Sequence, residues 1–156
     1  MLICLLVTSS CNSFLNSTSD FKEVDFTNGQ KIQLVTGEDV YNLFVSFNEN
    51  GEFTLKYLPE TSEILENITV TVKGDNAEIS TDELRFSKNI YEFNNSFAPK
   101  IIYVFFKNTD FKTENFVFNN SKNSKTLTKN ILEKTVDFTV TLAEDKQTRV
   151  YLLEIR

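Results

Sequence analysis

The chain lacks histidine and tryptophan altogether, and its 156 residues include only two cysteines, two prolines and four glycines. Histidine is the commonest general base near neutral pH and a frequent metal ligand, so its absence excludes Ser-His-Asp and Cys-His catalytic arrangements. None of the glycines lies in a phosphate-binding pattern, which excludes the P-loop and the dinucleotide fingerprint. The carboxylates lie near turns, without the alternating ligand spacing of a calcium loop. We therefore expect a non-catalytic protein without a metal ion or cofactor.

Positive charge is also in short supply. Asp and Glu number 22 against 16 Lys and Arg, which gives a formal net charge of −6. Proteins that bind nucleic acid need a concentrated Lys and Arg surface, and this chain has no dense basic block. The composition therefore excludes nucleic acid as the main partner.

The N-terminal segment has the order of features found at a signal-peptide cleavage site. Leu2–Val7 is a run of six apolar residues, well short of the ~20 that a membrane-spanning helix needs. Small residues lead from this run to Cys11, as they do ahead of a cleavage site. The run is short and no positively charged stretch precedes it, so we expect the signal to start upstream of Met1.

Val7-Thr8-Ser9-Ser10-Cys11 resembles the bacterial lipobox. The resemblance implies that residues 1–10 are removed as a signal peptide and that the Cys11 thiol carries the lipid anchor on the extracytoplasmic face of the cell membrane. Residues 11–20 are polar and without periodicity, as a tether would be, and residues 21–156 form a single domain. In the alternative interpretation, Leu2–Val7 is a buried first strand and Cys11 is an ordinary thiol.

From residue 21 onward, alternating apolar and polar residues predict a series of strands. The clearest patterns are three hairpins, which pair 41–47 with 53–57, 68–72 with 77–81, and 136–142 with 150–154. Weaker patterns predict strands at 116–118 and 126–132 and a further pair, 23–26 with 32–35, around Asn28-Gly29. Short turns between successive strands favour an antiparallel sheet of roughly eight to ten strands.

Residues 98–107 favour a helix instead. Pro99 suits the first helical turn, and Asn95 or Ser96 is the candidate N-cap. One apolar stripe runs along the segment through Ile101, Ile102, Phe105 and Phe106. These residue types also form strands, so a strand remains the alternative. A second, short helical turn is expected at 60–66.

The order of these elements resembles that of a known group of carriers. A hairpin that runs into Tyr57-Leu-Pro59 is followed by an acidic connector, a second hairpin, Leu84-Arg-Phe86 and the segment behind Pro99. Over about residues 40–106 this order is similar to the LolA/LolB and LppX type of lipoprotein-carrier fold in lipoproteins of low-GC Gram-positive bacteria. The resemblance implies a mainly β (α+β) fold: a curved antiparallel sheet, or half-barrel, with one or two short helices on its concave side. A β-sandwich is the alternative.

The carrier resemblance also implies an apolar cavity between sheet and helix that binds a lipid or another apolar ligand. The candidate lining residues are Leu43, Val45, Phe47, Phe53, Leu55, Tyr57, Ile101, Ile102, Phe105 and Phe106. In the simpler interpretation, the same residues form an ordinary packed core, which a domain of this size needs in any case.

The sequence therefore leaves three functions open. The first is a membrane-anchored lipoprotein that binds a lipid or apolar ligand, and the second is a non-catalytic structural or adhesive module on the cell surface. The third is a secreted protein with N-glycans on the sequons that begin at Asn16, Asn67, Asn94 and Asn119.

Overall fold

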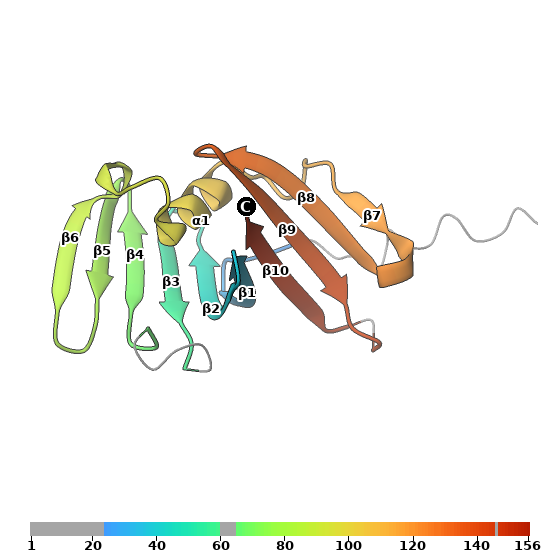
Figure 1. Cartoon of the computed structure of the whole chain (residues 1–156), viewed down its shortest axis with the longest axis horizontal. Coiled ribbons are helices and arrows are strands. Elements are labelled where there is room, and N and C mark those ends of the chain that lie inside the picture. The colour runs from blue at the N-terminus through green and yellow to red at the C-terminus, as the bar shows by residue number, and fades with distance from the viewer. Residues whose placement is uncertain (1–23, 60–64, 146) are drawn as a thin grey trace, which may run out of the picture.

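The computed structural model describes residues 24–59, 65–145 and 147–156 (Figure 1). The predictions for the signal peptide, Cys11 and the tether fall outside these residues, as does most of the helical turn expected at 60–66. The described part of the chain forms one ten-stranded sheet, two short 3-10 turns and one α-helix. The strands are β1 (Gln30–Thr36), β2 (Asp39–Phe47), β3 (Phe53–Tyr57), β4 (Thr69–Lys73), β5 (Asn76–Ser80), β6 (Arg85–Asn89), β7 (Val117–Asn119), β8 (Ser124–Ile131), β9 (Lys134–Leu142) and β10 (Arg149–Ile155). The helix is α1 (Ala98–Lys107), and the 3-10 turns are η1 (Ile90–Glu92) and η2 (Asn120–Lys122).

The sheet consists of two meanders joined side by side. Its strand order is β6-β5-β4-β3-β2-β1-β10-β9-β8-β7, so the chain runs outward from β1 to β6, crosses through α1 and returns from β7 to β10. The central pair, β1 with β10, is parallel and brings Ile32 opposite Tyr151. The prediction of purely antiparallel pairing was wrong at this pair. No tight turn joins these two strands, which lie near opposite ends of the domain sequence, so turn geometry does not fix their relative direction.

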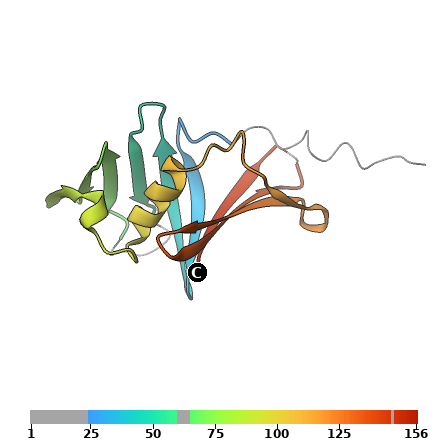
Figure 2. The ribbon, with the colours of Figure 1, turned by 90° about the horizontal axis from the view of Figure 1, so that it is seen from above.

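The sheet is curved and open. It bends where β1 meets β10, and α1 lies in the angle between the two wings in both views (Figures 1 and 2). Within the described residues, β6 and β7 are edge strands with a sheet neighbour on one side only. The structure thus confirms the predicted mainly β fold with a curved open sheet and a short helix on its concave side. It does not support the β-sandwich, because residues 98–107 are helical and the strands belong to one sheet.

The concave face and α1 enclose an aromatic core. The Phe26 ring packs edge-on against Phe106 with 4.6 Å between ring centroids, and the Phe138 ring stacks on Tyr151 at 6.0 Å. Phe105 also packs against Phe138 at 5.9 Å, which ties the helix to β9. Aromatic pairs in such geometries add ~0.5–1.5 kcal/mol each to the stabilisation from buried area. Phenylalanine is therefore the main packing residue, as expected for a chain with 15 Phe and no Trp.

The three strong hairpins are confirmed, as are the two strands predicted near 116–118 and 126–132. The hairpin predicted around Asn28-Gly29 is wrong: β1 pairs instead with β2, and the described part of the predicted first strand, residues 24–26, lies outside the sheet. Gly29, at φ 77°, does close a turn, in which its N–H donates to the Phe26 carbonyl oxygen at 3.0 Å. The segment ahead of this turn leaves the sheet because the Phe26 side chain is buried, at 4% exposure, in the aromatic core.

The predicted N-cap of α1 is also wrong. Phe97 occupies the N-cap position and makes no side-chain capping bond. The Asn95 side chain instead accepts from the Lys100 ammonium at 2.8 Å, and the Ser96 N–H donates to Asn94 Oδ1 at 2.9 Å. Both candidates are thus engaged in the loop ahead of the helix. Pro99 does lie in the first turn, as predicted.

Candidate functional site

The ten residues predicted to line a cavity come together between the sheet and α1. Nine of them are at most 9% exposed and belong to one core cluster, and Phe47 packs against that cluster while partly buried. The Phe106 ring lies 6.4 Å from both Phe47 and Phe53, so strands β2 and β3 contact the helix directly. This placement agrees with the simpler interpretation as packed core. Their role as the lining of a ligand cavity stays a prediction.

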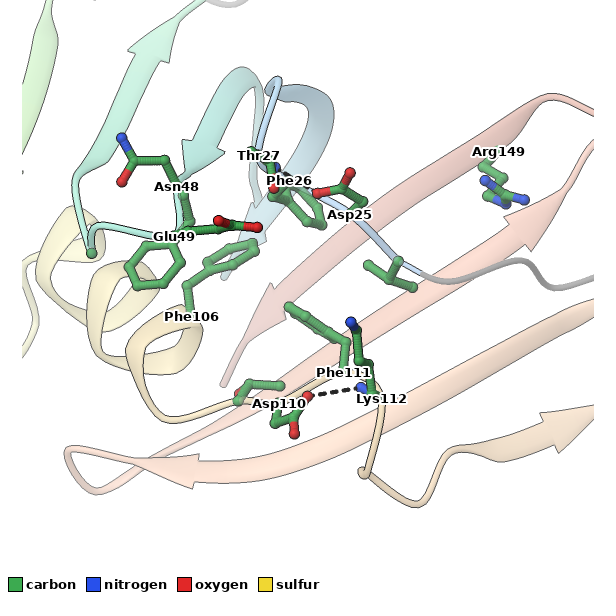
Figure 3. Close-up of a pocket in the computed structure, with 14 residues that line it drawn as sticks. Asp25, Phe26, Thr27, Asn48, Glu49, Phe106, Asp110, Phe111, Lys112 and Arg149 are labelled. Carbon is green, nitrogen blue, oxygen red and sulfur yellow. Dashed lines mark hydrogen bonds between the residues drawn. The ribbon is translucent and has the colours of Figure 1, made fainter.

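An open groove of about 760 Å³ lies at the C-terminal end of α1 (Figure 3). Its walls are the segment ahead of β1, the turn between β2 and β3, the loop after α1, and the start of β10. Of the ten predicted residues, Phe47 and Phe106 line it. The full lining is Val24, Asp25, Phe26, Thr27, Phe47, Asn48, Glu49, Gly51, Phe106, Thr109, Asp110, Phe111, Lys112 and Arg149.

The middle of the groove is aromatic. The Phe111 ring lies 5.7 Å from Phe106 and 6.0 Å from Phe26, and its other side packs on Phe138 at 5.3 Å. Phe26 and Phe106 are themselves largely buried, at 4% and 2% exposure. The ring surface that this part of the groove offers therefore comes from the partly buried Phe47 and Phe111, which pack on the core beneath them.

Backbone hydrogen bonds hold the polar rim. Asn48 Oδ1 accepts from the N–H groups of Asn50 and Glu52 at 3.1 and 2.9 Å, which fixes the turn between β2 and β3. Across the groove, Asp110 Oδ1 accepts from the Lys112 N–H at 3.1 Å (Figure 3). Hydrogen bonds from the Thr27 side chain and backbone lower the pKa of Asp25, so this carboxylate is ionised at neutral pH.

Arg149 lies where the groove meets the start of β10. Its Nε atom is buried, and it is the one buried side-chain nitrogen or oxygen without a hydrogen-bond partner in the described parts of the chain. A buried donor without an acceptor costs about 1–3 kcal/mol, so native proteins usually satisfy such groups. This unsatisfied nitrogen is therefore an exception that needs a reason.

A buried cation, Lys125, lies on the same face of the sheet as Arg149. Lys125 on β8 is opposite Val140 on β9, and Arg149 on β10 is opposite Leu142 on β9, so all four side chains are on the concave face. Lys125 is 8% exposed, and its ammonium lies 4.4 Å from the centroid of the Phe116 ring. Burial, and then repulsion from Arg149, lowers the pKa of Lys125. This corner of the concave face therefore disfavours further positive charge.

The described residues hold no group of three or more His, Cys, Asp and Glu side chains that could bind a metal ion. Within the same residues, no helix has both the length and the hydrophobicity to cross a bilayer.

The sequence interpretation missed several groove residues because they lie in irregular segments. Phe111 comes from a loop without apolar periodicity, and Phe26 was expected in a strand of a hairpin, so pattern arguments assigned neither residue to the groove. A signal was nevertheless present, since each Phe is isolated between an acidic residue and a polar residue, as in Asp25-Phe26-Thr27. Nothing in the local sequence marks Arg149, because its environment depends on the pairing of β10 with β9.

No protein-family model matches the chain, and no curated protein or solved structure matches it either. The fold and the site thus define a class by geometry alone: an open, mainly β domain with a groove at one end of its single described helix. The lipoprotein-carrier resemblance remains a hypothesis.

Proposed function

We propose that the protein is an extracytoplasmic lipoprotein, anchored to the membrane through Cys11, whose domain binds an apolar ligand such as a lipid. The observation that carries the proposal is the groove with its aromatic middle and polar rim. Its volume of about 760 Å³ is within the ~300–1,000 Å³ range of small-molecule sites. An alkyl chain that covers the phenylalanine rings would gain ~0.8 kcal/mol for each CH₂ removed from water.

The site differs in position from the one expected from sequence. The residues between β2, β3 and α1 pack against one another, whereas the groove lies at the end of the helix, where Phe47 and Phe106 reach its wall. We therefore assign ligand binding to the groove, and we assign the buried residues beneath it to its support.

The groove also lies close to the proposed anchor along the chain. Val24 lines the groove, and 13 residue steps separate it from Cys11. At ~3.3–3.6 Å per extended residue, that segment spans at most about 45 Å. A protein anchored through Cys11 would thus keep the groove near the membrane surface, where lipid is abundant.

Binding is tested with a neutral fluorescent dye, N-phenyl-1-naphthylamine, added to the purified chain and then displaced by dodecanol. We expect saturable binding, and Phe47→Ala should weaken it roughly fivefold because the partly buried ring contributes ~1 kcal/mol of apolar contact. Phe86→Ala is the matched control, since Phe86 is 54% exposed on the edge strand β6, outside the groove. If the native chain bound neither dye nor dodecanol, the proposal of an apolar-ligand site would fail.

The anchor is tested separately in a Gram-positive host that expresses the chain with a basic N-terminal extension ahead of Leu2 and is fed an alkyne-tagged fatty acid. We expect the chain to take up the label and to sediment with membranes, and we expect Cys11→Ser to abolish both. Cys4→Ser is the matched control, because this second cysteine lies inside the proposed signal peptide. Labelling that persists in Cys11→Ser would disprove the anchor assignment without affecting the groove.

The structural or adhesive alternative has less support. A strand at residues 98–107 in a second, stacked sheet would have favoured it, and these residues form α1 instead. We therefore propose no second function.

A further inference from the structure

Building on the proposed function, we infer that the ligand is a single-chain fatty acid whose carboxylate binds to Arg149 and whose alkyl chain lies on the phenylalanine rings of the groove. The first support is the unsatisfied Arg149 Nε. An arginine accepts a carboxylate most favourably through two parallel N–H···O bonds, and Nε is one donor of the fork that makes this geometry possible. Arg149 lines the groove, and a carboxylate that displaced the atoms covering Nε would supply the acceptor that the described residues do not.

The second support is the concentration of positive charge on this corner of the concave face. Arg149 and Lys125 lie on the same face, one on each side of β9, and Lys125 is buried. Among the described residues, no carboxylate lies within ion-pair distance of the Arg149 guanidinium. By contrast, Arg156 pairs with Asp137, and Lys129 pairs with Glu114. An anionic ligand group would offset the repulsion between Arg149 and the buried Lys125.

The third support is the polarity of the groove along its length. Glu49 lies at the end formed by the turn between β2 and β3, while Arg149 lies at the other end, beside β10 (Figure 3). Of the other acidic lining residues, Asp25 accepts from the Thr27 N–H at 2.8 Å and Asp110 accepts from the backbone of Lys112. These carboxylates would repel a ligand anion, and the lining offers it two cations, Arg149 beside β10 and Lys112 beside Phe111.

The groove also offers a surface for the alkyl chain. Phe106 lies beside Glu49 in the view of Figure 3, Phe26 and Phe111 lie further toward Arg149, and the three rings contact one another. A chain that extends from Arg149 across these rings would bury its methylene groups while its carboxylate remains paired. The open groove of about 760 Å³ favours one chain over the two chains of a membrane phospholipid.

The inference is tested with four probes that share a twelve-carbon chain and differ in the headgroup: dodecanoate, dodecanol, dodecyl phosphate and dodecyltrimethylammonium. Each displaces N-phenyl-1-naphthylamine from the purified full chain at pH 8, below its micelle concentration. We expect dodecanoate to bind about 10–100-fold more tightly than dodecanol, which is the range for hydrogen bonds to a charged group. Dodecyltrimethylammonium should bind more weakly than dodecanol.

Arg149→Met should reduce the preference for dodecanoate over dodecanol to within about twofold, because methionine keeps the length of the side chain without its donors. In Arg149→Lys, the ratio of the dodecanol Kd to the dodecanoate Kd should be less than a tenth of the native ratio. An ammonium attracts the carboxylate but cannot form the two-point contact. The matched control is Arg85→Met, because Arg85 lies on β6 at the other end of the sheet and pairs with Glu78. This control should keep the native preference. Near-ultraviolet circular dichroism checks that each variant is folded.

The outcomes separate the two levels of the proposal. Equal binding of dodecanol and dodecanoate, or tighter binding of the cationic or phosphate probe, would overturn the fatty-acid inference and leave the apolar site standing. A dodecanoate preference that survives in Arg149→Met would overturn the role of Arg149. Failure of every probe and of the dye to bind would instead defeat the proposed function itself. If Arg149→Met does not fold, the comparison of Arg149→Lys with the native chain decides the question.

Discussion

Replacing Arg149 with methionine should make the protein more stable. The native guanidinium leaves a buried Nε unsatisfied and lies near the buried Lys125, whose pKa is lowered by burial and by Arg149 itself. A buried donor without an acceptor costs about 1–3 kcal/mol. Because the Arg149 side chain is partly exposed, we place the gain near the low end, at ~1 kcal/mol. That gain corresponds to a rise in Tm of ~2–4 °C for a domain of this size.

The assay is urea unfolding followed by far-ultraviolet circular dichroism at pH 7, without added ligand. Arg85→Met is the control, and we expect it to lower the free energy of unfolding by no more than ~1 kcal/mol, because its ion pair with Glu78 is exposed. In a second measurement, the pKa of Lys125 followed by NMR should rise toward its ordinary value of 10.5 in Arg149→Met, while burial still holds it below that value. A loss of 1 kcal/mol or more in Arg149→Met would refute the reasoning. It would show that Arg149 stabilises the fold, so that its unsatisfied Nε would no longer point to a ligand.

Three further predictions test the rest of the structure. Lys100→Met should lower the free energy of unfolding by ~2–4 kcal/mol, because the buried ammonium donates to the carbonyl oxygens of Tyr91 and Phe93 at 3.1 and 2.7 Å. Chemical denaturation measures this loss, and a loss below 1 kcal/mol would contradict the prediction. Phe138→Ala should lower the free energy of unfolding by ~3–5 kcal/mol in the same assay, since the fully buried Phe138 ring packs against Phe105 and Phe111. A loss below 1.5 kcal/mol would show that the core collapses into the space that the ring leaves. Burial raises the pKa of Tyr57 above 10.0, so the folded state holds this proton more tightly than the unfolded state does. The free energy of unfolding should therefore fall as the pH rises from about 10 through the folded pKa, and it should fall less steeply in Tyr57→Phe. Equal slopes in the two proteins would contradict the raised pKa of Tyr57.

The hairpins could be predicted because their determinants are local. In β2 and β3 the buried side chains alternate with half-buried or exposed ones, and the turn between them contains Gly51 at φ 74°. The helix was predictable for the same reason, since Pro99 and one apolar stripe identify both its first turn and its buried face. Each of these elements is specified by residues close together in the sequence: the hairpin lies within residues 39–57 and the helix within 98–107.

The rest of the fold depends on contacts between distant segments. The parallel pairing of β1 with β10 joins residues more than a hundred positions apart, and no turn signal announces it. The detachment of Phe26 from a hairpin depends on the aromatic pocket formed by α1 and β9, which no local pattern specifies. Lys100 belongs to a helix predicted from its apolar stripe, yet Lys100 itself is 3% exposed. Its burial is possible because three oxygens ahead of the helix accept hydrogen bonds from its ammonium.

In the candidate site, too, residues of regular elements could be predicted and residues placed by distant contacts could not. Phe47 and Phe106 were identified because they belong to regular elements, whereas Phe111 and Arg149 depend on how loops and strands meet. The predicted cavity and the observed groove thus share two residues at one end of the helix. A loop phenylalanine between polar neighbours is the one sequence feature that would have extended the prediction toward the groove.

Native mass spectrometry of the full chain, titrated with dodecanoate, measures directly whether the groove binds one fatty acid through Arg149. We expect one dodecanoate bound per chain, with the bound species strongly reduced in Arg149→Met and in Phe47→Ala and unchanged in Arg85→Met. A native chain that binds no dodecanoate in repeated preparations, or that binds several molecules without dependence on Arg149 and Phe47, would contradict this expectation.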